Sequence, residues 1–269
     1  MKLGFLYAGQ GSQHAGMGAD LYEAFSAFRA VYDHAEVDFD LKKVSFEDPD
    51  GIINQTRYTQ PCMVAFAAGM TAVLREKGIT PAVAAGLSLG EYSALHAAGV
   101  FDAATAIRLV AFRGKAMEEA AAGRESAMMA VLNLDRSPLQ DACDAASDLG
   151  CVVIANYNCP GQIVITGLAE AVEEASEKLK AAGGRRVIPL NVSGPFHSAM
   201  LATAGKELGK VLEGVTLHEL KIPYVTNVTA EYVEAKIDEF NATNDKGIEI
   251  DLNIITDDYV NMMSLAYYS

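Results

Sequence analysis

Apolar and polar positions along the chain follow two periods, which together predict a mixed α/β protein. Short apolar runs at residues 2–8 and 81–87 have the length of buried strands. Helical spacing of apolar positions, as at Leu21, Phe25 and Phe28, predicts helices between and after these strands. The helices predicted for the first half of the chain span residues 20–33, 60–77, 91–98 and 102–121, with a polar connector at 36–58.

The pattern changes between residues 125 and 190. The elements predicted there are strand, helix, strand, strand, helix and strand, at 127–132, 137–149, 151–156, 162–166, 169–182 and 185–190. That order is the ferredoxin-like arrangement (βαββαβ), whose ends lie close enough together for insertion into a host domain. We therefore predict a large α/β domain made of residues 1–123 and 191–269, with residues 124–190 as an inserted ferredoxin-like domain.

The clearest chemical signal is Gly-x-Ser-x-Gly at residues 86–90. Ser88 falls where the strand at 81–87 gives way to a helix, and Gly86 and Gly90 lack the Cβ atoms that would crowd so sharp a turn. The helix start directs backbone N–H groups at an anion formed there, with Leu89 as the expected donor to an oxyanion. The pattern predicts a nucleophilic Ser88 in an α/β-hydrolase-like domain with a parallel sheet. The alternative is a tight turn with an incidental serine.

One charged side chain is out of place on the helix predicted at 102–121. Steps of three and four residues put Arg113 on one stripe with Leu109 and Ala116, so a guanidinium projects from an apolar face. Burying that charge is costly unless it is paired, and no acid lies on the same stripe. A structural ion pair and a functional role both remain open for Arg113.

A serine hydroxyl is a weak nucleophile until a base removes its proton. Four histidines occur in polar or surface-like contexts, and we interpret them as solvated or locally bonded: His14, His34, His96 and His218. His197 differs, because it follows Gly194 and Pro195 in a rigid turn just where the chain returns to the large domain. His197 is therefore the predicted base. No acid is well placed as the third member of a catalytic triad with Ser88 and His197, since Asp102 is already explained as a helix cap.

Charge and cysteine usage narrow the class of protein. A net charge of −14 over 269 residues argues against general affinity for nucleic acid or anionic membrane. The apolar run at 58–74 contains Gln60 and Pro61 and falls short of a membrane span. The glycine-rich loop at 9–18 fails the dinucleotide pattern, because His14 stands where that pattern needs glycine. Four widely spaced cysteines without Cys-x-x-Cys predict small buried hydrophobes in a reducing cytoplasm, and neither a zinc site nor a disulfide framework.

With these residues identified, the sequence resembles the malonyl-CoA:acyl carrier protein transacylases and the acyltransferase domains of polyketide synthases. The resemblance covers about residues 3–230 and rests on six motifs: residues 9–13 (GQGSQ), 58–61 (YTQP), 86–95 (GLSLGEYSAL), 113–114 (RG), 194–198 (GPFHS) and 227–230 (NVTA). Beyond residue 230, the family's helix with a glutamine and its later Gly-Pro-Gly turn are missing from 231–269.

The resemblance implies a role for each candidate residue. Ser88 carries the acyl group as an ester, and His197 is its base and the acid for the leaving thiol. Gln10 and the Leu89 N–H line the oxyanion hole, while Arg113 holds the free carboxylate of malonyl. A planar guanidinium on an apolar face suits that role, because the substrate brings it a bidentate partner. The pair Phe196-His197 looks like the malonyl-selective form of its motif.

By the same resemblance, malonyl passes from malonyl-CoA to Ser88 and then to the phosphopantetheine thiol of an acyl carrier protein, without a metal or a bound redox cofactor. We expect a cytoplasmic monomer whose partner is acyl carrier protein and which binds neither nucleic acid nor membrane. Three alternatives stay open: a trans-acting acyltransferase of a polyketide pathway, a serine hydrolase that uses the same turn around Ser88, and an inactive family member that lacks the usual C-terminal segment.

Overall fold

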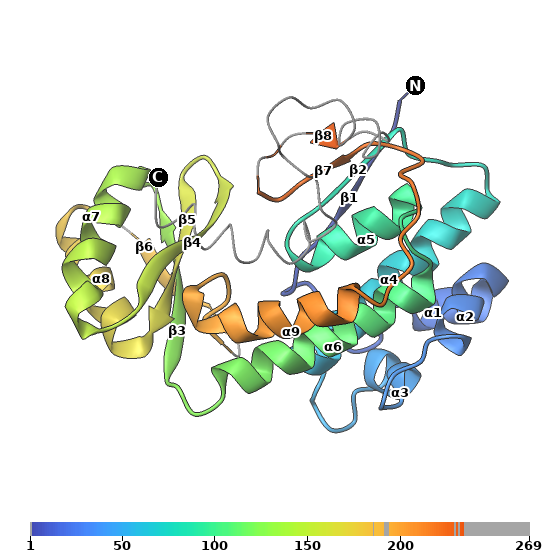
Figure 1. Ribbon diagram of the computed structural model, residues 1–269, viewed down its shortest axis with the longest axis horizontal. Helices are drawn as coiled ribbons and strands as arrows, with labels where there is room; N and C mark the ends of the chain where they lie inside the picture. Colours follow the sequence, from blue (N-terminus) through green and yellow to red (C-terminus); the bar gives the residue numbers. More distant parts are fainter. Residues whose placement is uncertain (1, 185, 191–193, 229, 231, 234–269) are drawn as a thin grey trace. The chain divides into compact units, whose positions relative to one another are not determined.

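The structure is a computed structural model that describes residues 2–184, 186–190, 194–228, 230 and 232–233 (Figure 1). The chain divides into two compact units. Among the described residues, unit 1 comprises those up to Lys115 and those from Leu208 onward, and unit 2 comprises those within Ala116–Glu207. The chain leaves unit 1 within helix α6 (Ala103–Ala121) and returns within α9 (Ala202–Leu212). The predictions for the C-terminal segment from residue 234 onward lie outside the described residues.

The sheet of unit 1 has the strand order β1-β2-β7-β8, made of Gly4–Tyr7, Val83–Gly86, Tyr224–Val225 and Tyr232–Val233. β1 pairs with β2, and β2 with β7, in parallel, whereas β8 runs antiparallel to β7. Tyr7 stands opposite Gly86, so the carboxyl ends of β1 and β2 lie side by side. The predicted α/β class and the parallel sheet are confirmed, and the carboxyl end of such a sheet is where ligands commonly bind.

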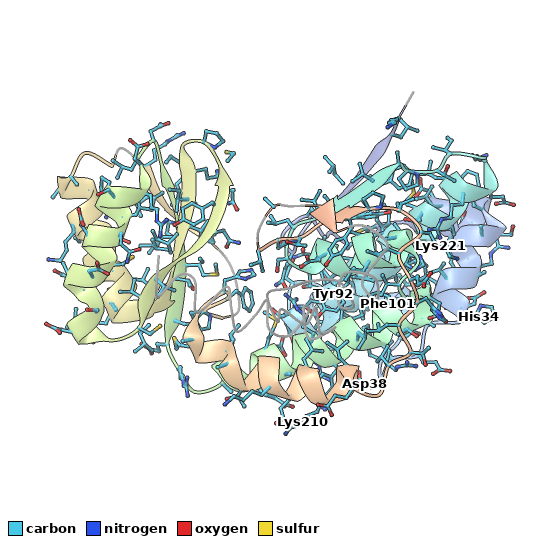
Figure 2. All side chains as sticks on the ribbon, turned by 45° about the horizontal axis from the view of Figure 1, so that its top comes forward. His34, Asp38, Tyr92, Phe101, Lys210 and Lys221 are labelled. Carbon is cyan, nitrogen blue, oxygen red and sulfur yellow. The ribbon has the colours of Figure 1, made fainter. Side chains whose placement is uncertain are left out.

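The helices of unit 1 pack around a core of fully buried side chains such as Phe28, Val64 and Ile107. Before α6 they are α1 (Ala19–Ala24), α2 (Ser26–Asp33), α3 (Leu41–Phe46), α4 (Thr56–Glu76) and α5 (Leu89–Ala98). Figure 2 shows Tyr92 of α5 in the interior of this unit and His34 at the end of α2 near its surface. No described helix is long and apolar enough to cross a membrane.

Three sequence predictions for unit 1 were wrong in detail. The single helix predicted at 20–33 is broken at Phe25, whose backbone is extended (φ −126°, ψ 119°), and after this break Phe28 packs over Gly69. The connector at 36–58 contains the short helix α3, which the side chain of Asp40 caps by accepting from the Lys43 N–H at 3.0 Å. Helix α4 begins at Thr56, four residues before the start predicted at residue 60, so Pro61 lies inside the helix.

Unit 2 contains the elements in the order predicted from the sequence. They are β3 (Ser126–Leu132), α7 (Arg136–Ala146), the 3₁₀ turn η1 (Ser147–Leu149), β4 (Val152–Cys159), β5 (Gln162–Leu168), α8 (Ala169–Ala181) and β6 (Arg186–Pro189). The strand order is β4-β5-β3-β6, and every neighbouring pair is antiparallel. Helices α7 and α8 lie side by side against this sheet (Figure 1), with Leu139, Ile165 and Leu179 fully buried between the layers.

Candidate active site

The turn between β2 and α5 holds Ser88 in an uncommon backbone conformation (φ 50°, ψ −102°). A left-handed φ in a residue other than glycine costs about 1–3 kcal/mol and persists only where the surroundings enforce it. The surroundings here leave no alternative to glycine on either side. A Cβ on Gly86 would overlap the carbonyl of Gly90, and a Cβ on Gly90 would overlap the carbonyl of Tyr7. The predicted strand-to-helix corner at Ser88 is therefore present.

The backbone groups of this corner have different partners. The Ser88 N–H donates to Oδ1 of Asn227 at 2.5 Å, and the Gly90 N–H donates to the Leu87 carbonyl at 2.9 Å. Within the described part of the chain, the N–H of Leu89 has no hydrogen-bond acceptor. This N–H belongs to the first residue of α5, where a helix start favours an anion. This corner, which spans residues 86–90 and is called the elbow below, thus keeps one backbone donor for a ligand.

The loop after β1 lies against this elbow. The Leu87 N–H donates to the Tyr7 carbonyl at 3.1 Å, and a Cβ on Gly9 would come within 2.8 Å of the Leu87 carbonyl. The next residue, Gln10, donates from its side-chain amide to Oγ1 of Thr56 at 3.1 Å. The fold therefore brings the loop that carries Gln10 to the same sheet edge as Ser88 and Leu89.

Arg113 is buried, with 3% of its surface exposed, and its Nη2 atom donates to Oγ of Ser88 at 3.2 Å. Its guanidinium carbon lies 5.6 Å from the centre of the Tyr92 ring. Gly114 lets α6 approach α4 here, since a Cβ would come within 2.7 Å of the Thr56 carbonyl. Burial lowers the pKa of Arg113, and the electrostatic influence of Tyr92 and Glu91 acts in the opposite direction. An arginine stays protonated at neutral pH even so, and a fixed cation therefore lies beside the serine.

His197 belongs to unit 2, whereas Ser88, Leu89, Gln10 and Arg113 belong to unit 1. The turn around His197 is closed by a hydrogen bond from the Phe196 N–H to the Gly194 carbonyl at 2.9 Å. Oγ of Ser198 also donates to the Pro195 carbonyl at 2.7 Å. His197 itself is half-buried and has a left-handed backbone (φ 60°). The rigid turn expected from the sequence is present, and the pairing of His197 with Ser88 remains a prediction.

The prediction for His96 was wrong in one respect. It was expected in a polar or surface-like context, but α5 is buried along almost its whole length and only 8% of His96 is exposed. Its Nδ1 atom lies 3.1 Å from the carbonyl oxygen of Phe101, so the imidazole is locally bonded as expected. Burial lowers the pKa of His96, which favours its neutral form.

Sequence reasoning assigned no role to Asn227, although this residue opens one of the recognised motifs. Its side chain bonds the Ser88 N–H and its backbone N–H donates to Oε1 of Glu91 at 3.1 Å. A signal was available, because Asn227 comes shortly after the mostly apolar stretch at 222–225, part of which forms β7. Polar residues at the carboxyl end of a parallel strand often face a site.

Together, these groups of unit 1 have the arrangement that nucleophilic chemistry on an anionic acyl compound requires. They comprise a half-buried serine in a turn with positive φ, a backbone donor suited to an oxyanion, and a buried cation beside the serine hydroxyl. The sequence model of the family described as acyl transferase domain matches residues 4–246. The chain belongs to this acyl transferase family.

Individual members of the family agree with this assignment. The chain is 41% identical over 240 residues to the malonyl CoA-acyl carrier protein transacylase of Bacillus subtilis strain 168, which covers 88% of this chain and 76% of that protein. A solved MCAT from Streptococcus pneumoniae superposes with a TM-score of 0.81 at 38% identity, covering 98% of this chain and 94% of that one. A solved malonyl-transacylase in complex with its type II PKS acyl-carrier protein superposes with a TM-score of 0.83 at 33% identity. The match covers 99% of this chain and 94% of that one. The resemblance found in the sequence is confirmed.

Proposed function

We propose that this acyl transferase moves a malonyl group from malonyl-CoA to the phosphopantetheine thiol of an acyl carrier protein, through an ester on Ser88. The observation that carries this proposal is the 3.2 Å contact between Nη2 of Arg113 and Oγ of Ser88. A buried guanidinium beside the atom that becomes acylated can read a free carboxylate on the acyl group. The names of the relatives, malonyl CoA-acyl carrier protein transacylases, support malonyl as that group.

In the proposed first half-reaction, Oγ of Ser88 attacks the thioester carbonyl while His197 accepts its proton. The negative charge that develops on the carbonyl oxygen is stabilised by the Leu89 N–H and the side-chain amide of Gln10. The carbon–sulfur bond then breaks, and the coenzyme A thiolate takes the proton from His197. In the second half-reaction the thiol of the carrier attacks the Ser88 ester by the same steps. Arg113 holds the malonyl carboxylate throughout.

The finer architecture is also part of this proposal. Residues 1–123 and 191–269 form an α/β-hydrolase-like catalytic domain, and residues 124–190 form an inserted ferredoxin-like domain. These boundaries differ from those of the two compact units, which divide the chain within α6 and α9. The strand order β4-β5-β3-β6 with antiparallel pairing supports the second assignment, and the turn at Ser88 between β2 and α5 supports the first.

The partner we propose is acyl carrier protein, and a solved malonyl-transacylase in complex with a carrier supports it. We expect the enzyme to act as a cytoplasmic monomer, to need neither a metal nor a redox cofactor, and to bind neither nucleic acid nor membrane. The same transfer serves fatty acid synthesis and polyketide synthesis. A carrier from each pathway, offered in competition, identifies the preferred acceptor.

Intact-mass measurement after mixing with malonyl-CoA tests the proposal. One malonyl ester is expected per chain, absent from Ser88→Ala and retained in the control Ser93→Ala, which alters a buried serine of the helix that follows, α5. Addition of phosphopantetheinylated carrier protein should move the malonyl group to the carrier. An adduct that survives Ser88→Ala contradicts the assignment of the nucleophile. Release of free malonate without transfer to the carrier identifies a serine hydrolase instead.

A further inference from the structure

Asn227 lies 139 residues from Ser88 in the sequence, yet its side-chain amide holds the elbow from both sides of Leu87. Oδ1 accepts from the Ser88 N–H at 2.5 Å, and Nδ2 donates to the Gly86 carbonyl at 2.5 Å. The two groups that it binds belong to the residues before and after Leu87. Its backbone N–H is directed elsewhere, to Oε1 of Glu91.

This pair of hydrogen bonds continues the parallel ladder beyond the end of the sheet. β2 and β7 pair Ala84 with Tyr224 and Ala85 with Val225, and two further steps in the same register place Leu87 opposite Asn227. In a parallel ladder, a residue bonds the C=O before and the N–H after the residue that faces it. The Asn227 amide makes these two bonds with its side chain, while its own backbone N–H bonds the side chain of Glu91.

The arrangement has two consequences for the site. First, the Ser88 N–H is already used, so within the described residues the elbow's remaining donor for an oxyanion is the Leu89 N–H. Second, both peptide groups around Leu87 are fixed, and they determine the backbone angles that lead into Ser88. A left-handed φ in a residue other than glycine needs such external support.

We propose that Asn227 is a positioning residue, whose side chain replaces a backbone peptide of β7 and holds Ser88 and the Leu89 N–H in their reactive geometry. It does not touch the substrate. The inference rests on the proposed function only in that malonyl transfer is the reaction measured. The geometry of the elbow does not depend on which acyl group is transferred. A serine-directed fluorophosphonate, which needs the same nucleophile and oxyanion donor, therefore serves as a second probe.

Two substitutions test the inference in the full-length protein. Asn227→Ala removes both side-chain hydrogen bonds, and we expect kcat for Ser88 acylation to fall roughly 100-fold, comparable to loss of one oxyanion-hole donor. KM for malonyl-CoA should stay near the wild-type value, because no substrate contact is removed. The rate of fluorophosphonate labelling should fall in parallel. The control Asn158→Ala, which removes a side-chain hydrogen bond to Gln162 in the exposed β4–β5 turn, should leave both rates unchanged.

Asn227→Asp keeps the size of the side chain and gives a pH signature that a merely structural role lacks. An ionised carboxylate accepts from the Ser88 N–H but repels the Gly86 carbonyl, whereas a protonated carboxyl can donate to it. The ratio of variant to wild-type rate should therefore rise as pH falls, when both are measured at each pH. A ratio that is independent of pH, or an Asn227→Ala enzyme with wild-type kcat, overturns the inference. If the wild type transfers no malonyl but Asn227→Ala still slows fluorophosphonate labelling, the proposed function fails and the positioning role stands.

Discussion

Nη2 of Arg113 and Oγ of Ser88 lie 3.2 Å apart, and they come from helix α6 and from the turn before α5. The guanidinium is buried, and its carbon lies 5.6 Å from the centre of the Tyr92 ring. Desolvation strengthens its interaction with any anion that enters. Since a guanidinium can bind a carboxylate through two parallel N–H groups, the proposed function puts the group that recognises the acyl chain beside the atom that receives it.

Arg113→Ala should separate recognition of malonyl from the chemistry at Ser88. Acylation by malonyl-CoA should fall at least 100-fold, since charge-assisted hydrogen bonds to a buried group are worth about 1.5–3 kcal/mol each and two are lost. Acylation by acetyl-CoA should hold or improve, because an acetyl group leaves the wild-type guanidinium without its carboxylate partner. Stopped-flow or quenched-flow rates with both thioesters give the comparison.

Arg136→Ala is the matched control for that experiment. Arg136 also lies over a tyrosine ring, 5.8 Å from the centre of Tyr157, but it is exposed and belongs to unit 2. Both thioesters should react with this variant at wild-type rates. Equal losses for malonyl and acetyl in Arg113→Ala would show that Arg113 supports the fold and does not read the carboxylate.

Gly90→Ala should destabilise the protein and disrupt the elbow together. The added Cβ would overlap the Tyr7 carbonyl, which is fixed because it accepts from the Leu87 N–H. Overpacking costs about 1–3 kcal/mol where side chains can yield, so we expect a loss of roughly 3 kcal/mol or more against fixed backbone. Urea unfolding measures this loss. Gly214→Ala is the control, because its nearest neighbour is the Val211 carbonyl at 3.6 Å, and a change within about 0.5 kcal/mol is expected there. Wild-type stability in Gly90→Ala would contradict the close approach of β1 to α5.

His96 should make the stability of the fold depend on pH. Burial lowers its pKa below the reference value of about 6.5 that applies to the unfolded chain. At pH values below about 6.5 the unfolded state therefore binds more protons than the folded state, and the free energy of unfolding falls as pH falls. This contribution is fully present above the unfolded pKa.

His96→Gln removes that titration. The difference in free energy of unfolding between wild type and this variant should change as pH is lowered from about 7.5 to 5, with the wild type losing more. The control is His34→Gln, because His34 is exposed (labelled in Figure 2). A constant difference between wild type and His96→Gln across this range would mean that His96 titrates alike in the folded and unfolded states.

The sequence by itself determined the local features of this protein. Ser88 could be placed at a strand-to-helix corner because apolar period and glycine spacing are encoded within a few neighbouring residues. The order of the elements in unit 2 followed from the same signals. Arg113 could be recognised as misplaced on its helix, although nothing local indicated what it contacts. The break at Phe25 was missed because the helical period of the apolar positions continues through it, whereas the packing of Phe28 over Gly69 of α4 is a tertiary contact.

Only the tertiary structure decided which distant residues serve the elbow. Arg113 reaches Ser88 from 25 residues away, and Asn227 reaches it from 139. These meetings depend on the pairing of β2 with β7 and on the approach of α6 to α4 at Gly114. Strand register and helix packing are set by the summed fit of many side chains, and no short stretch of sequence records that sum. The sequence indicates the serine, and the fold determines which distant residues contact it.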